Sequence, residues 1–349
     1  MATPIYEFAQ IPRVDPAAPA RARTRKVRAA GQAPTVGVIY NPRSHRNLGA
    51  DFDCSLSPHV HIAQPRARAQ LPEALADFAA KGIDLLVING GDGTVRDVLT
   101  CGQAIFGDDW PEIAVLPKGK TNALTFDLGI PDDWTLQDAI DALDQGGRVW
   151  RRPIAVSPAE DGASAAGMSR VAGFILGAGA FTKATQAGQS AHKLGAFDSM
   201  VVAVTGVWAL LQSLFASRAN PWRKGARMRI GLGASGVPME HSGHGNPEMR
   251  QLLFASTLER LPAGIRPFGA LKNGLKLVAV DQISRRTTAL IPLVLLGKLR
   301  GGLRERGIHQ LTASHFTLSI DDQFILDGEA FPAGDYLIGQ GPELAFVTP

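Results

Sequence analysis

The sequence contains little cysteine and few aromatic residues. Its two cysteines, Cys54 and Cys101, lie far apart and form no CxxC pair, so the sequence predicts neither a disulfide framework nor a zinc site and fits a reducing cytosol. Aromatic residues make up 7% of the chain and do not alternate with basic ones, so the stacking platform of a nucleic-acid binder is missing. We therefore expect no nucleic-acid partner.

Long apolar runs are also scarce. The first 34 residues contain no continuous apolar segment, which argues against a secretory signal, and their Ala/Pro/Arg-rich composition predicts a disordered basic tail over residues 1–34. Residues 199–217 carry no charged side chain and as a helix would span roughly 28 Å, close to the thickness of a bilayer core. Because Thr205, Gly206 and Gln212 dilute this stretch, we expect a buried or interfacial helix rather than a membrane span.

Positive charge is modest in total but unevenly placed. The formal net charge is +4, and basic residues gather at positions 21–28, 218–229 and 300–306, the last two after apolar stretches. Basic residues beside apolar segments indicate an anionic membrane surface. We therefore expect a cytoplasmic protein that associates peripherally with the inner face of the membrane, while the sequence leaves the oligomeric state open.

The chain of 349 residues, 45% of them hydrophobic, suggests about two domains. Between residues 35 and 150, strand patterns at 36–40, 85–88 and 113–116 alternate with helical spacing, which predicts a Rossmann-like α/β nucleotide-binding catalytic domain with a parallel sheet. Beyond residue 151 the pattern changes to short β-like runs between Gly- and Pro-rich connections. Residues 151–349 are therefore expected to form a mainly antiparallel β-sandwich domain, with a last strand able to pack near the interdomain region. The runs lie at 171–176, 228–231, 252–256, 275–280 and 316–320.

A glycine-rich turn follows one of the buried strands. Residues 89–94 read Asn-Gly-Gly-Asp-Gly-Thr directly after an apolar run. Glycine tolerates positive φ and lets backbone N–H groups close on a polyphosphate, while Asp92 can hold Mg²⁺ or take a proton from an attacking hydroxyl. An ordinary strand-to-helix turn is the alternative for a lone glycine cluster. However, polar loops at 41–44 and 117–122 also follow strands, and in a parallel sheet such loops meet in one crevice.

Several motifs, taken together and in order, resemble the diacylglycerol kinase catalytic-domain family, which includes bacterial diacylglycerol kinases, sphingosine kinases and ceramide kinases. They are Asn41-Pro42, GGDGT at 90–94, LPKGKTNAL at 116–124, FILGAG at 174–179 and LDGE at 326–329, within a likeness spanning about residues 35–348. The resemblance implies a two-domain kinase that binds ATP and Mg²⁺ at the interdomain cleft. It also implies phosphorylation of a lipid hydroxyl, on diacylglycerol or on a ceramide or sphingoid base.

Within this resemblance, Asp92 is assigned to Mg²⁺ and phosphate geometry and Glu329 to the general base, although the reverse assignment stays open. A glutamate with a pKa of about 4.3 cannot ionise an alcohol beforehand, so it would accept the proton as the bond to phosphorus forms. Asp327 is expected to stabilise a turn. At least one of Lys118 and Lys120 is expected to face phosphate. The residues assigned to the nucleotide are Asn41, Ser44, Gly90, Gly91, Gly93, Thr94, Lys118, Gly119, Lys120, Thr121 and Asn122.

Two rival functions remain. If the protein were a soluble-substrate kinase such as an NAD kinase, its apolar segments would only form part of the hydrophobic core. A catalytically silent lipid- or nucleotide-binding regulator is motivated by three departures from the family pattern: Lys120 after Gly119, no Asp at residues 151–155, and Asn273-Gly274 in place of Asp-Gly. His241, His244 and Glu248 have loosely metal-like spacing, but a glycine-rich loop around them disfavours a metal site.

Overall fold

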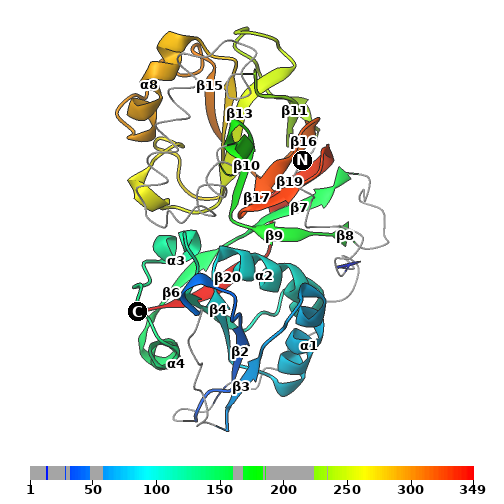
Figure 1. Ribbon diagram of the computed structural model, residues 1–349, viewed down its shortest axis with the longest axis vertical. Coiled ribbons are helices and arrows are strands. Elements are labelled where there is room, and N and C mark those ends of the chain that lie inside the picture. The colour runs from blue at the N-terminus through cyan, green and yellow to red at the C-terminus, as the bar shows by residue number, and fades with distance from the viewer. Residues whose placement is uncertain are drawn as a thin grey trace.

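The protein is described from a computed structural model that covers residues 13–14, 28, 32–47, 58–159, 168–183, 185, 224–233 and 235–349. Two bodies lie one above the other, each built on its own large sheet (Figure 1). Cys54, the apolar stretch at 199–217 and nearly all of the tail at 1–34 lie outside the described residues. Within the described ranges, no helix is long and apolar enough to cross a membrane.

The lower body contains a six-stranded sheet. β3, β2, β4 and β5 run parallel, in that order, because each is followed by a crossover through helix or loop. The C-terminal strand β20 lies beside β5 in this sheet, and β6 closes the edge antiparallel to β20 (Figure 1). The strands are β2 (Val36–Tyr40), β3 (Val60–Ala63), β4 (Leu85–Gly90), β5 (Glu112–Pro117), β6 (Gly147–Arg151) and β20 (Leu344–Thr348).

Helices cover both faces of this sheet. α1 (Leu71–Lys81) and α2 (Asp92–Phe106) pack against each other on one side, and α4 (Leu136–Gln145) packs against β4 and β20 on the other (Figure 1). α1 ends at Gly82, whose φ of 62° suits glycine, and α4 begins at Thr135, whose side chain accepts the N–H of Asp138. The short helix α3 (Ala123–Leu128) follows β5. The predicted parallel sheet with helices on both faces is thus confirmed.

The upper body is a curled antiparallel sheet of 12 strands. This confirms the predicted combination of an α/β part with an antiparallel β part. Its strands are β7 (Ile154–Pro158), β9 (Val171–Gly173), β10 (Ile175–Gly179), β11 (Ala226–Leu232), β12 (Val237–Pro238), β13 (Met249–Ser256), β14 (Leu275–Asp281), β15 (Ile308–Ala313), β16 (His315–Ile320), β17 (Phe324–Leu326), β18 (Glu329–Phe331) and β19 (Gly334–Gln340). One helix of this body is α8 (Arg285–Leu295), and β1 (Arg13–Val14) forms a small separate pair with β8 (Met168–Ser169).

One predicted strand is divided. The pattern at 171–176 predicts a single strand, which is wrong, because the structure has β9 and β10 separated at Phe174. The N–H groups of Phe174 and Ile175 donate to the carboxylate of Asp327 at 2.9 and 2.8 Å. A side chain from a distant turn therefore takes hydrogen bonds that a continuous strand would have made to a neighbouring strand.

Helix α2 lies between the two bodies (Figure 1). Its Val95, Val98 and Leu99 are buried in the core of the lower body. On its other side it packs against β9, where the Thr100 hydroxyl accepts the N–H of Ala172 at 3.0 Å. A second cluster of buried residues fills the inside of the curled sheet. The helix that begins in the glycine-rich turn is thus fixed by both bodies.

Candidate active site

The three polar loops expected at the strand ends are in contact. β2, β4 and β5 are neighbouring parallel strands, so their carboxyl ends meet at one edge of the sheet. The Asn41 amide donates to the Thr94 hydroxyl at 2.8 Å, which joins the first loop to the glycine-rich turn. The N–H of Arg46 donates to the carbonyl of Lys118 at 3.0 Å, which joins the first loop to the third.

The first loop is held by asparagine side chains. The side-chain oxygen of Asn41 accepts the N–H of Arg43 at 3.0 Å, and the N–H of Ser44 donates to the Asn41 carbonyl at 3.1 Å. The Asn47 amide then donates to that carbonyl and to the Asn89 side chain, at 2.9 and 2.7 Å. Asn41 and the buried Ser44 are therefore placed on one tight turn beside β4.

The glycines of the GGDGT turn serve close packing. Gly90, Gly91 and Gly93 are absent from the positive-φ residues of the described chain, and the φ of Gly91 is −93°, so these glycines do not use the positive φ that glycine permits. A Cβ on Gly91 would lie 2.6 Å from the Cα of Gly119, and one on Gly90 would lie 2.5 Å from the Thr94 hydroxyl. A Cβ on Gly93 would have its nearest neighbour at 3.6 Å. Glycine is thus required at 91 because the second and third loops touch there, and at 90 because the Thr94 side chain of the same turn packs against it.

Asp92 links the second loop to the third through its side chain. Its two carboxylate oxygens accept the N–H groups of Ala123 and Leu124, at 3.1 and 3.2 Å. These are the first N–H groups of α3, whose own N-cap residue Asn122 has a φ of 49° and makes no side-chain cap. Burial raises the pKa of Asp92, although these backbone hydrogen bonds oppose the shift. The sequence did not reveal this capping role.

The third loop is closed by Asn122. Its side-chain oxygen accepts the N–H of Gly119 at 2.8 Å, and its amide donates to the Gly119 carbonyl at 3.2 Å. The N–H of Lys118 donates to the carbonyls of Leu116 and Gly90, at 2.8 and 3.3 Å. Lys120 and Thr121 are exposed on this turn, whereas Lys118 is half-buried. The loop therefore holds these residues at the sheet edge beside Asp92.

The Asp327-Gly328-Glu329 turn of the upper body reaches the same place. It joins β17 to β18, and Asp327 and Gly328 both have positive φ, at 44° and 82°, as a type I′ turn requires. Burial, together with the charge of Asp92, raises the pKa of Asp327 to about 7. Two carboxylates that are distant in sequence, one from each body, thus lie close enough to repel each other.

Arg96 is a site residue that the sequence reasoning missed. It lies on α2, its side chain is 2% exposed, and it donates to the Asp327 carbonyl at 3.0 Å and to Glu329 Oε1 at 2.9 Å. Asp97 accepts from the same guanidinium at 3.0 Å. The sequence did offer a signal, because Arg96 stands among the apolar helix positions Val95, Val98 and Leu99. An arginine buried with them needs an anionic partner.

The two oxygens of Glu329 differ. Oε1 accepts from Arg96 and lies 4.0 Å from Arg68 Nη2, whereas Oε2 is buried and has no hydrogen-bond partner among the described residues. Arg68 in turn pairs with Asp97, at 3.2 Å. Glu329 is therefore fixed through one oxygen while the other can accept a proton, as a general base must.

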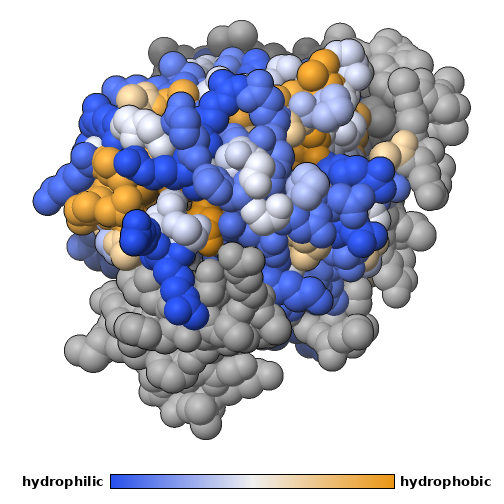
Figure 2. All heavy atoms as spheres, turned by 90° about the horizontal axis from the view of Figure 1, so that it is seen from above, coloured by the Kyte–Doolittle hydropathy of each residue, from blue (hydrophilic) through white to orange (hydrophobic). Residues whose placement is uncertain are grey.

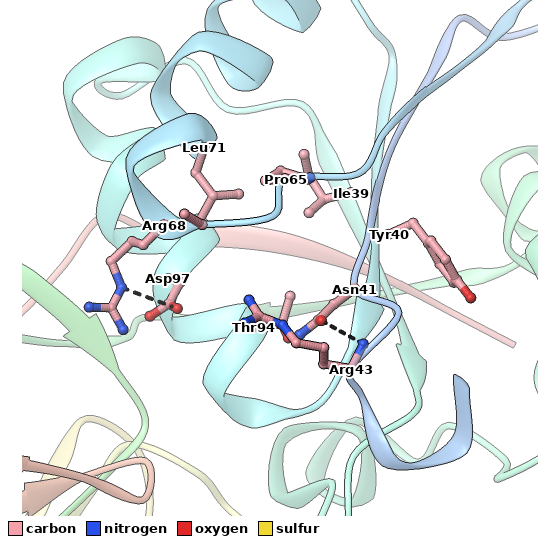
Figure 3. A pocket seen from close by; sticks show the side chains of 10 residues that line it. Ile39, Tyr40, Asn41, Arg43, Pro65, Arg68, Leu71, Thr94 and Asp97 are labelled. Carbon is pink, nitrogen blue, oxygen red and sulfur yellow. Dashed lines mark hydrogen bonds and ion pairs between the residues drawn. The ribbon is translucent and has the colours of Figure 1, made fainter. Parts of the chain in front are cut away.

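A hollow of about 360 Å³, open to solvent, lies beside this network. Figure 3 shows Arg68 with Asp97 on one side of it and Asn41, Arg43 and Thr94 on another. Asn41 and Thr94 were predicted from the sequence, whereas Arg43 and Arg68 add two cationic side chains that were not. Its lining residues are Ile39, Tyr40, Asn41, Arg43, Pro65, Ala67, Arg68, Leu71, Thr94 and Asp97.

The carboxylates suit a metal that a nucleotide brings with it. Within the described residues, no three His, Cys, Asp or Glu side chains are grouped so that they could hold a metal alone. Mg²⁺ usually takes one or two protein carboxylates and completes its shell with phosphate and water. Asp92 supplies one such carboxylate, and its charge acts on Asp327 in the turn of the upper body. By contrast, His244 contacts the Glu305 carbonyl at 2.8 Å, and Glu248 pairs with Arg227 at 3.3 Å.

This fold and site define the class: a two-part α/β plus β protein in which a turn of the β part completes the strand-end loops of the α/β part. Residues 35–151 match the family model for the diacylglycerol kinase catalytic domain. The resemblance stated from the motifs is thereby confirmed.

Individual relatives are distant. The protein named "Probable lipid kinase YegS" of Shigella flexneri is 27% identical over 73 residues, which cover 21% of this chain and 24% of that protein. The protein of the same name in Escherichia coli O157:H7 matches to the same extent, so the chain spans about a quarter of the length of these relatives. Among solved structures, a diacylglycerol kinase of Bacillus anthracis strain Sterne superposes with a TM-score of 0.56 at 14% identity, over 90% of this chain and 97% of that one. Another Bacillus anthracis structure gives a TM-score of 0.61 at 16% identity, with the same coverage. These likenesses support the two-part fold.

Proposed function

We propose that the protein is a lipid kinase that transfers the γ-phosphate of ATP to a hydroxyl group of an acyl lipid. The observation that carries the proposal is the position of Glu329: Arg96 holds one of its oxygens beside the glycine-rich turn, while the other is buried and unpartnered. The match to the diacylglycerol kinase catalytic-domain model supports a phosphotransferase, and the matched relatives are named probable lipid kinases.

The reaction mainly requires the protein to position the two substrates and to neutralise charge on the phosphate oxygens. In our proposal the hydroxyl oxygen of the lipid attacks the γ-phosphorus, its proton passes to Oε2 of Glu329, and the bond from phosphorus to the bridging oxygen of ADP breaks. Asp92, with Asp327 nearby, would hold Mg²⁺, which supplies positive charge to the phosphate oxygens. Asp92 would keep its hydrogen bonds to α3, because each carboxylate oxygen has a second lone pair.

The remaining predicted residues are proposed to bind the nucleotide. Asn41 and Thr94 line the hollow, and Arg43 and Arg68 add positive charge at its wall, which suits a polyphosphate. Lys118 and Lys120 flank Gly119 on the loop that precedes α3, and at least one of them is proposed to neutralise phosphate charge. Ser44, Gly90, Gly91, Gly93, Thr121 and Asn122 complete the proposed set.

The acceptor class follows from the family and from the charge pattern. Diacylglycerol and a ceramide or sphingoid base are the two proposed acceptors. The basic clusters beside apolar stretches support a protein that associates with an anionic membrane surface at the cytoplasmic face.

The decisive experiment is label transfer from γ-labelled ATP with Mg²⁺ to a panel of lipids in mixed micelles. The panel contains diacylglycerol, ceramide, free sphingoid bases and, as a soluble acceptor, NAD. Wild type is compared with Asp92→Asn and with a surface control, Asp77→Asn, whose carboxylate pairs with Lys81 on the outside of α1. We expect one lipid to be labelled by wild type and by the control but not by Asp92→Asn.

Other outcomes replace the proposal with a defined alternative. Label on NAD alone would assign a soluble-substrate kinase. Nucleotide binding without label on any acceptor would assign a catalytically silent regulator.

A further inference from the structure

Helix α8 of the upper body buries polar side chains and exposes apolar ones, which is the reverse of the usual distribution. Thr287 and Thr288 are buried, whereas Leu293 and Leu296 are 42% and 54% exposed. The buried threonines are accommodated by local hydrogen bonds, since the Thr288 hydroxyl donates to the Ser284 carbonyl at 3.0 Å. A helix that served only the core would bury its leucines and expose its threonines.

The exposed apolar residues form a continuous stripe. Ala289, Pro292, Leu293 and Leu296 follow the spacing i, i+3, i+4, i+7, which places them on one side of the helix, and all four are exposed. Seen from above, apolar side chains gather at the left of the molecule, the side on which α8 lies in Figure 1 (Figure 2). This stripe is too regular to be a scatter of single surface residues.

Basic residues stand at both ends of the stripe. Arg285 and Arg286 precede Ala289 by four and three positions and so lie on the same side of the helix, and Lys298 and Arg300 follow the helix end. All four are exposed. The helix dipole disfavours positive charge in a first turn, so Arg285 and Arg286 do not serve the stability of α8. Residues 282–306 contain six basic residues and one acidic residue, Glu305, which gives a net charge of +5.

We propose that this face of α8 docks the protein on an anionic lipid bilayer. The α8 face comprises Arg285, Arg286, Leu293, Leu296, Lys298 and Arg300. Leucine tips that enter the acyl boundary, with basic residues at the level of the headgroups, are the pattern of an interfacial helix. A second copy of the chain is a poor occupant, because two faces that each carry Arg285, Arg286, Lys298 and Arg300 would repel each other. The inference rests on the proposed lipid acceptor and names the surface that brings the protein to it.

The test is co-sedimentation with vesicles of phosphatidylcholine alone and of phosphatidylcholine with 30% phosphatidylglycerol. Wild type should bind the anionic vesicles and lose binding as salt rises, because screening weakens the attraction. Arg285→Gln/Arg286→Gln should lower the partition coefficient about 30-fold on the basis of about fivefold per basic residue. Leu293→Ser/Leu296→Ser should lower it about tenfold or more, and this loss should persist at high salt.

Two matched controls separate this face from the rest of the surface. Val237→Ser removes an apolar side chain that is 57% exposed on β12, and Lys81→Gln/Lys272→Gln removes two exposed positive charges that lie outside the basic clusters. Both should bind as wild type does. The inference is overturned if the α8 variants bind normally, if the controls lose binding equally, or if binding does not depend on anionic lipid.

The result can be read independently of the proposed chemistry. The α8 variants are assayed in parallel for label transfer in neutral detergent micelles, where docking on an anionic surface plays no part, and should match wild type there. Loss of vesicle binding with no activity in any protein, including wild type, would retain the docking face and reject the kinase proposal. If wild type transfers label but does not bind vesicles, the kinase proposal is retained and the docking face is rejected.

Discussion

At the scale of a residue, one oxygen of Glu329 is held by Arg96 while the other is buried without a hydrogen-bond partner among the described residues, and this asymmetry makes a sharp prediction. Glu329→Gln keeps an oxygen that can accept the hydrogen bond from Arg96 but removes the basic carboxylate. We expect label transfer to fall by about 10²- to 10⁴-fold, the usual contribution of a general base. ATP affinity and the unfolding midpoint should change little by comparison. Glu343→Gln, at an exposed carboxylate, is the control. A turnover close to that of wild type would exclude Glu329 as the base.

Asp327 gives the protein a predicted dependence of stability on pH. Its pKa is raised from 3.8 to about 7 in the folded state, so between those values the native protein keeps a proton that the unfolded chain has lost. The resulting stabilisation is fully present below about pH 4 and is lost as pH rises to 7. Asp327→Asn should flatten this decline, and the residual slope should come from Asp92, whose pKa is also raised.

The measurement is urea unfolding of the ligand-free protein at intervals between pH 4.5 and 7.5. Asp335→Asn, at an exposed aspartate of β19, should retain the slope of wild type. A wild-type protein whose stability rises with pH across this window would contradict the prediction.

At the scale of elements, the two loops that meet at Gly91 and Gly119 should tolerate no added atom. A Cβ on Gly91 would lie 2.6 Å from backbone, and backbone cannot move aside as a flexible side chain can. We expect Gly91→Ala to cost about 1–3 kcal/mol in the free energy of unfolding, as overpacking generally does, and to weaken ATP binding because both loops shift.

Gly93→Ala is the matched control, because its Cβ would meet nothing closer than 3.6 Å and alanine favours the helix in which Gly93 lies. It should be at least as stable as wild type. Thermal unfolding and calorimetric ATP titration of both variants check the pair. Equal destabilisation by the two substitutions would mean that the loops do not pack as described.

Local pattern predicted the elements better than it predicted their partners. The strands at 36–40, 85–88 and 113–116 and the loops after them were found because apolar runs and polar turns are properties of neighbouring residues. The pattern did not predict the Asp92 cap on α3 or the hydrogen bonds from residues 174 and 175 to Asp327, because each of these joins residues far apart in the chain. Arg96 escaped for the same reason, since its partner Glu329 lies in the other body.

At the scale of the molecule, the lower body depends on β20, a strand that follows the whole upper body in the sequence. β20 stands between β5 and β6, and its Leu344, Phe346 and Val347 are at most 1% exposed. Their burial contributes roughly 5–9 kcal/mol, at about 1.5–3 kcal/mol for each side chain. That is comparable to the whole stability of a typical domain, about 5–15 kcal/mol.

A chain truncated after residue 342 should therefore lose the lower body even though residues 35–151 remain. We expect low solubility, loss of ATP binding, and rapid proteolysis within residues 35–151. Removal of Pro349 alone, which follows the last strand, should have no effect. A truncated protein that still binds ATP with the affinity of wild type would show that β5 and β6 do not need β20.

The place of β20 also bears on how the protein is made. A ribosome releases the chain from its N-terminus, and most domains can fold as soon as their own segment has emerged. Here the segment that bears the GGDGT turn emerges before the upper body, but β20, the strand that joins β5 to β6, emerges after it. The sheet of the nascent lower body therefore stays incomplete until the upper body has been synthesised. Consequently a translation product interrupted before β20 has an unfinished sheet, and we expect the proposed nucleotide site to be complete only after β20 has emerged.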